Sequence, residues 1–483
     1  MVWRKRGTAQ RQIEKERETK QEGDGGWALP REVAKKKERV GGGGPFGAEP
    51  SIRAGGNMYA IIGFALMPLL WSLPECVMTY ELSSSYPCDS GGVRFTEEAF
   101  GETTGLLVGY LGWISGVANT ASLPSLLLSY VLSQFFPDVQ STDEDVVEHY
   151  GIMVCITLAF AYVNYRGLGV VGPAVIVIFF VSMTPFLLMV VIGLPRVDPR
   201  KWLQTPVPIT SESSDDIPFT GRGWFPLVYP AGIAFRPFVN NLYWNFNGFD
   251  QASHYSRMVA KGTLRNGVGG SLVLVSLAYL LPIMIATGAT DIEQDDWTNG
   301  SFAVAGSEIG GRWLGVSLLA LFFSGMSADS IGIQGLADRG QLPSIFRHRS
   351  RHDTPTYALL LGVALILALL PLPFGTIIEL ANFTFCISVS IEFMSFVQLR
   401  IISGESAKFR KTLYSVMLIL PFVYNITVML TASYTTYIYA AIVAVFGVMI
   451  ILARGHLIDE EVLQTRLDEM ENARIIANLP ILL

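Results

Sequence analysis

The chain has 483 residues, of which 50% are hydrophobic and only 16% are charged. A soluble protein carries about 25% charged residues, so this composition excludes an ordinary soluble domain. The apolar residues form long runs with almost no charges, such as Ile61–Trp71, Val170–Leu194 and Tyr437–Leu452. A bilayer core requires about 20 mostly apolar residues per helix, and helices satisfy their own backbone groups in lipid. The composition therefore predicts an all-α polytopic membrane protein.

In chain order, residues 1–40 mix Lys, Arg, Glu and Gly with few apolar residues, which predicts a disordered charged tail without a signal peptide. Residues 41–454 are expected to form the transmembrane domain, and 455–483 a cytoplasmic tail. Eleven helices are predicted in the transmembrane domain. They are Asn57–Leu82, Gly105–Phe136, Tyr150–Tyr165, Val170–Leu194, Phe238–Asp250, Gly267–Ala289, Trp313–Ala337, Tyr357–Leu370, Phe374–Leu399, Leu413–Leu430 and Thr435–Leu452.

Charges in the loops predict the topology. Loops Asp138–Glu148 and Asp291–Glu308 are acidic, whereas the loops that contain Arg166, Arg257–Arg265, Arg339–Arg351 and Arg400–Lys411 are basic. The two sets alternate along the chain, and the positive-inside rule places the basic set in the cytoplasm. With eleven spans the basic N-terminal tail would lie outside. An even number fits better, which predicts that a span before residue 57 is shortened or missing.

Five segments together resemble one transporter family. They are GGGGPFGAEP at Gly41–Pro50, WSLPECVMTYELSSSYP at Trp71–Pro87, LYWNFNGFD at Leu242–Asp250, SADSIGIQGLADRGQLP at Ser327–Pro343 and ANFTFCISVSIEF at Ala381–Phe393. In this order they resemble the plant and protist polyamine uptake transporters, polyamine:proton symporters of the amino acid–polyamine–organocation superfamily. The resemblance extends from Gly41 to Leu452.

This resemblance implies a fold of two inverted five-helix repeats with two additional C-terminal helices. In such folds the first helix of each repeat is broken near the middle of the membrane, and substrate binds at the breaks. The glycine run would then be the break in helix 1, with Ala48–Ala54 as the second half. The charged stretch Arg31–Arg39 stands where the family has an apolar first half. We therefore expect that this first half is absent from the chain, in agreement with the charge pattern of the loops.

A polyamine is a flexible polycation, so its site needs carboxylates, carbonyl oxygens and aromatic faces. The predicted helix Phe238–Asp250 is helix 6 when the broken helix 1 is counted before Asn57–Leu82, and helices 3 and 10 are then Gly105–Phe136 and Phe374–Leu399. Helix 6 offers all three, because Trp244 supplies a π face and Asp250 a charge. Asn245, Asn247 and Gly248 weaken the helix and free its carbonyl groups. The alternative is that this segment ends a helix and that Asp250 lies at the cytoplasmic surface. The family usually has two aromatic residues before this aspartate, where this chain has glycine and phenylalanine.

Further substrate-binding candidates lie at the break of helix 1 and on helices 3 and 10. Glycine tolerates positive φ and close ligand approach, although a glycine run can also be a flexible linker. The superfamily often places ligands on helices 3 and 10, and a tyrosine usually stands at the position of Phe385, so a role of that residue here is apolar. These candidates are Gly41, Gly42, Gly43, Gly44, Asn119, Tyr130, Asn382 and Phe385.

Three carboxylic acids are proton-coupling candidates, because charge buried in a membrane helix is costly and is kept for function. Glu75, Asp329 and Glu392 each lie about two turns inside a predicted helix. Glu75 follows Pro74, which opens the hydrogen-bond ladder of the backbone. The alternatives are that Glu75 is an interfacial carboxylate paired with Arg94, and that the other two make packing hydrogen bonds.

No residue set indicates an enzyme. The five histidines lie in loops or at helix ends, and no HExxH or paired-aspartate motif is present. We expect no metal, no cofactor and no disulfide framework. The basic loop with His348 and His352 orients the protein and contacts anionic lipid, so no nucleic-acid partner is expected.

The sequence thus predicts a secondary transporter that imports putrescine- or spermidine-like organic cations by proton symport. Its partners are the cation, the proton and the lipid bilayer, and its expected location is the plasma membrane, with an endomembrane as the alternative. Two other functions stay open: an amino acid permease of the same superfamily, and a non-transporting sensor or inactive truncated product.

Overall fold

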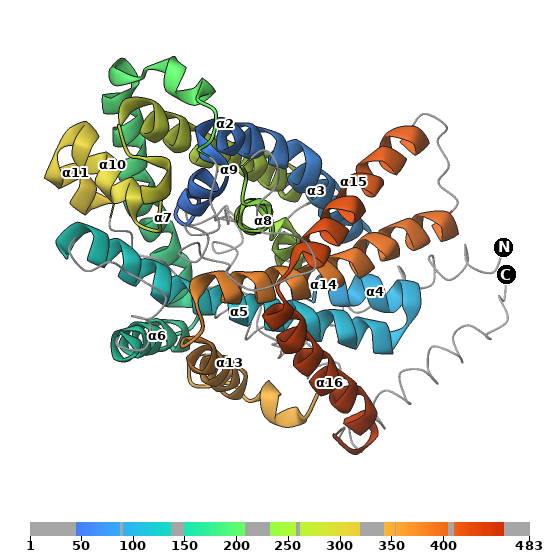
Figure 1. Ribbon diagram of the computed structural model, residues 1–483. Helices are drawn as coiled ribbons and strands as arrows, with labels where there is room; N and C mark the ends of the chain where they lie inside the picture. The colour runs from blue at the N-terminus through green and yellow to red at the C-terminus, as the bar shows by residue number, and fades with distance from the viewer. Residues whose placement is uncertain are drawn as a thin grey trace, which may run out of the picture.

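The computed structural model describes residues 45–86, 90–136, 149–207, 232–256, 261–318, 342–352, 354–403 and 410–457. Within these ranges the regular elements are helices, and the only strand pairing is an isolated bridge between Arg349 and Pro355 (Figure 1). The predicted all-α fold is therefore confirmed. Gly41–Gly44, Asp329 and both predicted tails, apart from 455–457, lie outside the described residues.

The helices of the N-terminal half follow the apolar runs of the sequence. Helix α2 and helix α3 are joined by a π-helical turn, Pro68–Ser72, into one apolar segment. The bounds in this half are α2 Glu49–Met67, α3 Leu73–Ser85, α4 Gly92–Phe100, α5 Glu102–Phe135, α6 Tyr150–Tyr165 and α7 Leu168–Gly193.

The C-terminal half begins with a short helix and a 3₁₀ segment, and then continues with longer helices. The bounds are α8 Phe235–Phe246, η5 Phe249–Tyr255, α9 Lys261–Ala289, α10 Ser301–Gly310, α11 Arg312–Ser317, α13 Thr356–Leu369, α14 Phe374–Ser403, α15 Arg410–Thr431 and α16 Tyr434–Leu457. Short 3₁₀ turns lie at Leu194–Arg196, Pro199–Leu203, Gln294–Asp296 and Ser344–Arg347.

Six segments of the described chain are long and apolar enough to cross a membrane, and three shorter helices are also apolar. The helix predicted over Phe238–Asp250 begins earlier, at Phe235, and ends at Phe246. Of the helix predicted over Trp313–Ala337, the first residues lie in α11, and residues 319–341 lie outside the described chain, so the rest of this helix stays a prediction. Helices α4 and α10 were not predicted, because they are short and lie in segments that carry charges.

Helix α2 changes direction at Gly56, whose backbone has φ 70° and ψ 173°. The turn before it, Glu49–Gly55, is a short helical segment that agrees with the predicted half-helix Ala48–Ala54. A side chain at Gly56 would meet Pro206 at 2.9 Å in addition to the strain of its positive φ, so glycine is required here. The kink lets one continuous stretch of chain supply two differently directed helices.

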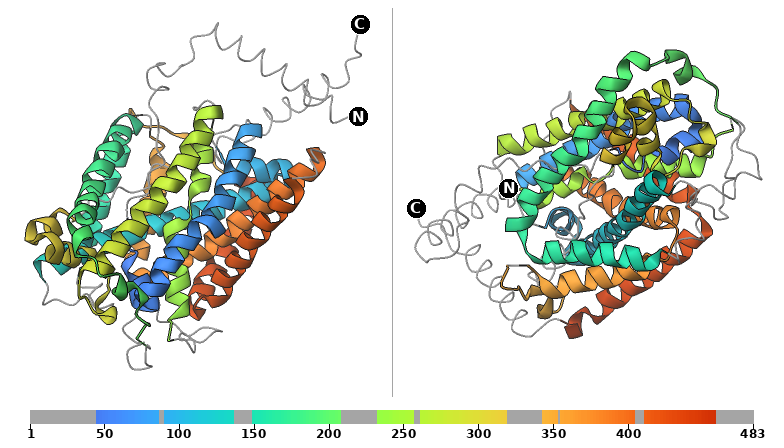
Figure 2. Two further views of the ribbon diagram at one scale, coloured as in Figure 1. Left: turned by 90° about the horizontal axis from the view of Figure 1, so that it is seen from above. Right: turned by 90° about the vertical axis from the view of Figure 1, so that its left-hand side faces the viewer.

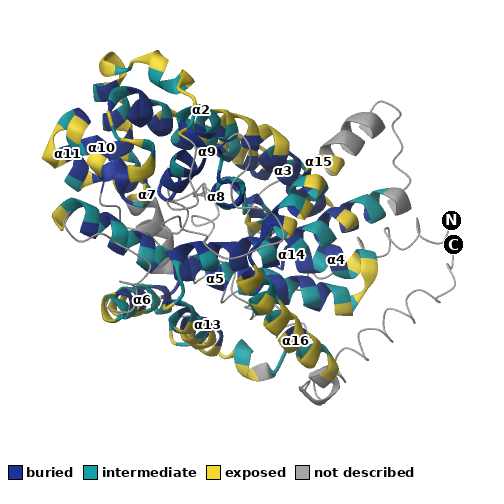
Figure 3. Ribbon diagram, in the orientation of Figure 1, coloured by how far each residue is buried: buried dark blue, intermediate teal, exposed yellow. Residues whose placement is uncertain are grey.

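The long helices cross the molecule at different angles (Figure 2). Helix α14 packs along α5 in the interior, α2 packs against α8, and α4 contacts both α5 and α14. Burial is highest on these central helices, whereas α16 is largely exposed (Figure 3). The exposed side chains of α16 are apolar, as expected for a surface that faces lipid.

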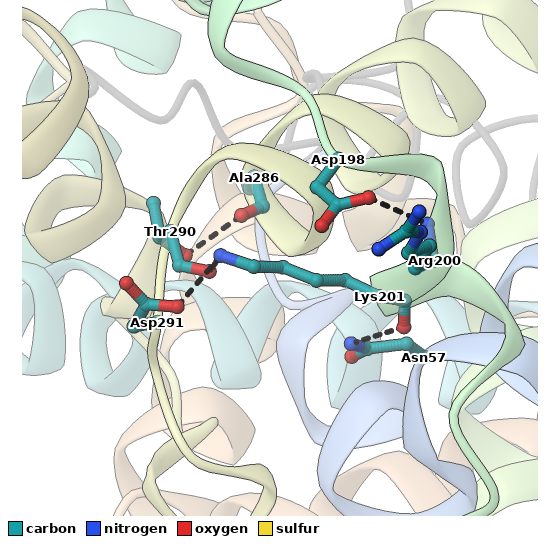
Figure 4. A network of polar contacts seen from close by, with 7 residues as sticks. All are labelled: Asn57, Asp198, Arg200, Lys201, Ala286, Thr290 and Asp291. Atoms are coloured by element: carbon teal, nitrogen blue, oxygen red, sulfur yellow. Dashed lines mark hydrogen bonds and ion pairs between the residues drawn. The ribbon is translucent and has the colours of Figure 1, made fainter.

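A network of polar contacts holds the turn Pro199–Leu203 against the C-terminal end of α9 (Figure 4). The Lys201 ammonium donates to the carbonyl of Thr290 at 2.8 Å and contacts Asp291 at 2.6 Å, while the Lys201 carbonyl accepts from Asn57 at 3.2 Å. Asn57 directly follows the kink at Gly56. The network therefore joins three separate segments of the chain at one surface of the helix bundle.

Candidate functional site

The helical structure is interrupted between α8 and η5. Helix α8 ends at Phe246, Asn247 is extended with φ −88° and ψ 170°, and Gly248 is left-handed with φ 94°. An L-residue with a side chain adopts the Gly248 conformation only at a cost of roughly 1–2 kcal/mol. The break leaves backbone carbonyl and N–H groups without helical partners, as the sequence predicted for this segment.

Two side chains of the α2–α3 segment bind these free backbone groups. Ser72 Oγ donates to the Phe246 carbonyl at 2.9 Å, and Glu75 Oε1 accepts from the N–H groups of Gly248 at 3.1 Å and Asp250 at 3.2 Å. Ser72 and Glu75 are three residues apart and therefore lie on one helix face. Glu75 thus caps the start of η5. The alternative pairing with Arg94 is wrong in this structure, because Arg94 contacts Glu97 and Glu98.

Trp244 connects the break after α8 with the residues that follow the glycine run. Its indole Nε1 donates to Asn119 Oδ1 of α5 at 2.6 Å, and its ring meets Phe374 edge-on with centroids 5.8 Å apart. The six-membered ring lies directly over Gly47, where an added Cβ would be 2.6 Å from Trp244 Cζ3. Gly47 follows Pro45 and Phe46 of the glycine-run motif, so the described end of helix 1 and the broken helix 6 are in contact.

Comparison with known proteins identifies the family. Residues 38–456 match the family model described as amino acid permease. The chain belongs to the amino acid permease family. The Arabidopsis thaliana protein named "Probable polyamine transporter At3g19553" is 32% identical over 422 residues, which is 84% of this chain and 82% of that protein. Polyamine transporter RMV1 of the same plant is 33% identical over 74% of this chain and 70% of its own. Polyamine transporter PUT1 of Oryza sativa subsp. japonica is 32% identical over 76% and 66%.

The permease is therefore a multi-pass membrane protein of a transporter family, which agrees with its apolar helices. Its three carboxylic acids around the helix 6 break come from three elements. Glu75 lies on α3, Asp250 on η5 and Glu392 on α14, and the negative charge of Asp250 acts on both glutamates. The side chains of Glu75 and Asp250 lie within hydrogen-bonding reach of each other, with Oε2 and Oδ1 buried, and Glu392 is 5% exposed.

In the described part of the chain, little positive charge lies near the three carboxyl groups. In the described ranges no Lys or Arg forms an ion pair with Glu75, Asp250 or Glu392, and His254 is the group that attracts Asp250. The Glu392 carboxyl packs over Gly92 at the start of α4, where an added Cβ would overlap it. The three acids do not have the arrangement of a metal site. The cluster can accept an organic cation or a proton.

Asparagines of α8, of the break after it and of α14 form hydrogen bonds with one another and with Gly47. Asn382 of α14 is fully buried, donates to the Asn240 carbonyl at 2.9 Å and accepts from Asn247 at 3.4 Å. Asn241 donates to the Gly47 carbonyl at 2.7 Å and receives a hydrogen bond from Asn245. Asn245 Oδ1 has no partner in the described structure. The predicted residues Asn247 and Asn382 are thus in contact, whereas Asn245 contacts Asn241.

Tyr130 and Phe385 lie apart from this polar chain. Tyr130 of α5 is fully buried and donates its hydroxyl to Glu49, at the other end of the short segment before Gly56. Phe385 of α14 is buried, with its ring edge-on to Tyr243 at 6.1 Å, and Tyr243 stacks on Tyr424 at 5.5 Å. The surroundings of Phe385 are aromatic, which agrees with the apolar role expected for a phenylalanine where the family usually has a tyrosine.

Sequence reasoning missed several buried polar residues of the permease. Glu379 of α14 accepts from the backbone and hydroxyl of Ser433 and from Thr436 Oγ1, which places it at the start of α16. Arg236 of α8 is 3% exposed and is attracted by Glu379. Glu49 is the third charged residue of this kind. Each is a charge inside or beside an apolar run, and that signal could have identified all three.

Proposed function

We propose that this permease is a secondary carrier that imports polyamines, with the proton as the coupling ion. The observation that supports the proposal most is the convergence of Glu75, Asp250 and Glu392 at the break beside α8. Acidic groups in a membrane protein attract a cation, and three neighbouring acids that form no ion pair with a described Lys or Arg suit a polyvalent cation. Trp244 adds an aromatic face on the same broken helix, which favours an ammonium group. The names of the relatives point to the same substrate class.

The geometry argues against an amino acid as the substrate at this break. An amino acid brings a carboxylate, which permeases of this fold type bind with free N–H groups at a helix start. The N–H groups of Gly248 and Asp250 already donate to Glu75. A substrate carboxylate would therefore meet the three acids without these donors. The glycine run of helix 1, which could also bind a carboxylate, lies outside the described residues, so the amino acid alternative is kept as an outcome of the test.

Proton coupling and location are part of the proposal. Glu75 and Glu392 are the described candidates, since either can hold a proton when no substrate amine is present. Asp329 remains a third candidate. Transport would follow alternating access, in which one group of helices rocks around the site between helices 1 and 6. The family resemblance favours the plasma membrane.

The test is uptake of labelled spermidine and putrescine into proteoliposomes that contain the full chain. We expect saturable uptake that an inward proton gradient accelerates, with unlabelled putrescine as an effective competitor and leucine as a poor one. Empty liposomes supply the background. Good uptake of leucine or arginine without uptake or competition by spermidine would establish the amino acid alternative. A purified, folded protein that moves neither class would be a sensor or an inactive product.

A matched pair of substitutions tests the site. Asp250→Asn keeps the shape of the side chain and removes its charge, and it should weaken spermidine more than putrescine because the longer amine carries more charge. Asp291→Asn is the control, since its side chain is 94% exposed in the network with Lys201. The control should transport as the unchanged protein does. Equal uptake by both variants would place the substrate site elsewhere.

A further inference from the structure

A second acid, Glu49, lies two residues after Gly47, which contacts Trp244. Glu49, in the first turn of α2, is 0% exposed. Its Oε1 accepts from the Tyr130 hydroxyl and from the Gly300 N–H at 3.1 Å, whereas its Oε2 is buried and makes no hydrogen bond in the described structure. One oxygen of this fully buried carboxyl group therefore accepts no hydrogen bond from the described residues.

In the described part of the chain, the groups that contact the Glu49 carboxyl are neutral. The groups that face it are the hydroxyls of Tyr130 and Tyr279 and the N–H groups of Gly300 and Phe302 at the start of α10. In the described ranges no Lys or Arg forms an ion pair with Glu49. A buried carboxylate whose partners are only neutral donors has unused capacity for a cation.

A series of aromatic rings in edge-on contact begins at Tyr130, whose hydroxyl donates to Glu49, and ends at Phe302, whose N–H faces Glu49. Phe46 meets Tyr130 edge-on at 5.2 Å and Phe186 at 4.8 Å, and Phe186 meets Phe302 at 5.6 Å. Faces of aromatic rings attract ammonium groups, and a set of them around one acid is a known way to bind such cations. We call Phe46, Tyr130, Phe186 and Phe302 the aromatic cage.

Glu49 and Asp250 belong to the two segments that meet where Gly47 contacts the indole of Trp244. Glu49 is two positions beyond Gly47, and Asp250 is six positions beyond Trp244, after the break. The Glu49 carboxyl accepts from the Gly300 N–H at the start of α10, whereas the Asp250 N–H donates to Glu75 of α3. The two acids therefore have different neighbours, and a linear cation with an ammonium group at each end would place one end at each acid.

We propose that Glu49 and the aromatic cage bind a second ammonium group of the substrate, so that the permease recognises a polyamine by both of its ends. This subsite rests on the proposed polyamine transport and deepens it. It explains selection of amines with charges far apart, since a monoamine satisfies only one of the two acids. Substrate binding would be completed on the α10 side of Trp244.

The experiment compares spermidine with a monoamine, n-butylamine, in the uptake assay. Glu49→Gln keeps the size of the side chain and its acceptor oxygen but removes the charge. We expect the KM for spermidine to rise by about tenfold or more, and the inhibition constant of butylamine to change by less than about twofold. Glu308→Gln is the control on α10, because its side chain is exposed, and it should change neither value.

Other results would overturn the subsite. Equal losses for both amines indicate a structural role of Glu49, and loss of pH dependence with unchanged spermidine preference indicates a proton site. If Glu49→Gln does not reach the membrane, Phe186→Leu decides, since it keeps bulk but removes a π face. A loss confined to spermidine supports the proposal, and an equal loss overturns it. Failure of the unchanged permease to take up spermidine would instead refute the polyamine function.

Discussion

Gly47 lies under the indole of Trp244, and an alanine at this position has no room. The added Cβ would be 2.6 Å from Cζ3 and 3.1 Å from Cη2 of the ring. Both are closer than ordinary carbon contacts of about 3.5–4.0 Å. The aromatic ring is rigid, so Gly47→Ala must displace Trp244 or the backbone of the first half-helix. Displacement of Trp244 also breaks its hydrogen bond to Asn119.

The free-energy cost follows from these contacts. Gly47 has φ +77°, which costs a residue with a side chain about 1–2 kcal/mol. Loss of the Trp244 hydrogen bond adds about 1 kcal/mol, and up to about 3 kcal/mol if Asn119 stays buried without a partner. Gly248 provides the comparison, because it has φ +94° but its nearest neighbour would be Gln251 Nε2 at 3.9 Å. Gly248→Ala therefore costs only the backbone strain.

The measurements are the thermal midpoint of the purified permease in detergent and the KM for spermidine. We expect Gly47→Ala to lower the midpoint more than Gly248→Ala. It should also raise the KM by up to about thirtyfold, the equivalent of losing a cation–π contact of about 2 kcal/mol. If both alanine variants behave alike in stability and KM, the contact between Gly47 and Trp244 does not exist in the working protein.

Four further substitutions test the same region. Trp244→Leu keeps bulk without the ring and should weaken spermidine binding by up to about thirtyfold at unchanged surface expression, and normal affinity would exclude a π contact. Glu75→Gln and Glu392→Gln mimic the protonated acid, so at least one should lose the acceleration by external acid while it retains exchange, and full pH dependence in both would place coupling elsewhere. Ser72→Ala leaves the Phe246 carbonyl without its partner and should destabilise the permease by about 1–3 kcal/mol, seen as a lower thermal midpoint, unless water replaces the hydroxyl.

Helices with a long apolar run were predictable within a few residues, because the membrane imposes length and composition on them. The bounds of α6 agree completely with the prediction, and those of α13 differ by one residue at each end. Helix α4 could not be found in this way. It carries charges at Arg94, Glu97 and Glu98 and is packed on neighbours rather than exposed to lipid, so hydropathy alone contains little signal for it.

The residue types of the site were predictable, but their contacts were not. Trp244 and Asp250 stood out because they interrupt an apolar run. The hydrogen bonds from Gly248 and Asp250 to Glu75 join residues more than 170 positions apart, and no local pattern indicates such a pair. Glu49 was passed over because it follows a glycine run that dominated the interpretation. A search for every acid near an apolar run would have included it.

The π-helical turn Pro68–Ser72 has a consequence for how the length of this segment can vary. A π turn holds one residue more than the corresponding α-helical turn. Deleting one residue of this turn, such as Leu69, would leave a regular α-helix, because the π turn accommodates its extra residue in the space of one α-helical turn. Ser72 and Glu75 would then still face the backbone groups that they bind in the broken helix. A deletion in the regular helix between Gly56 and Pro68 would instead rotate both side chains by about 100°. The π-helical turn is thus the place where this segment can lose a residue without losing these contacts.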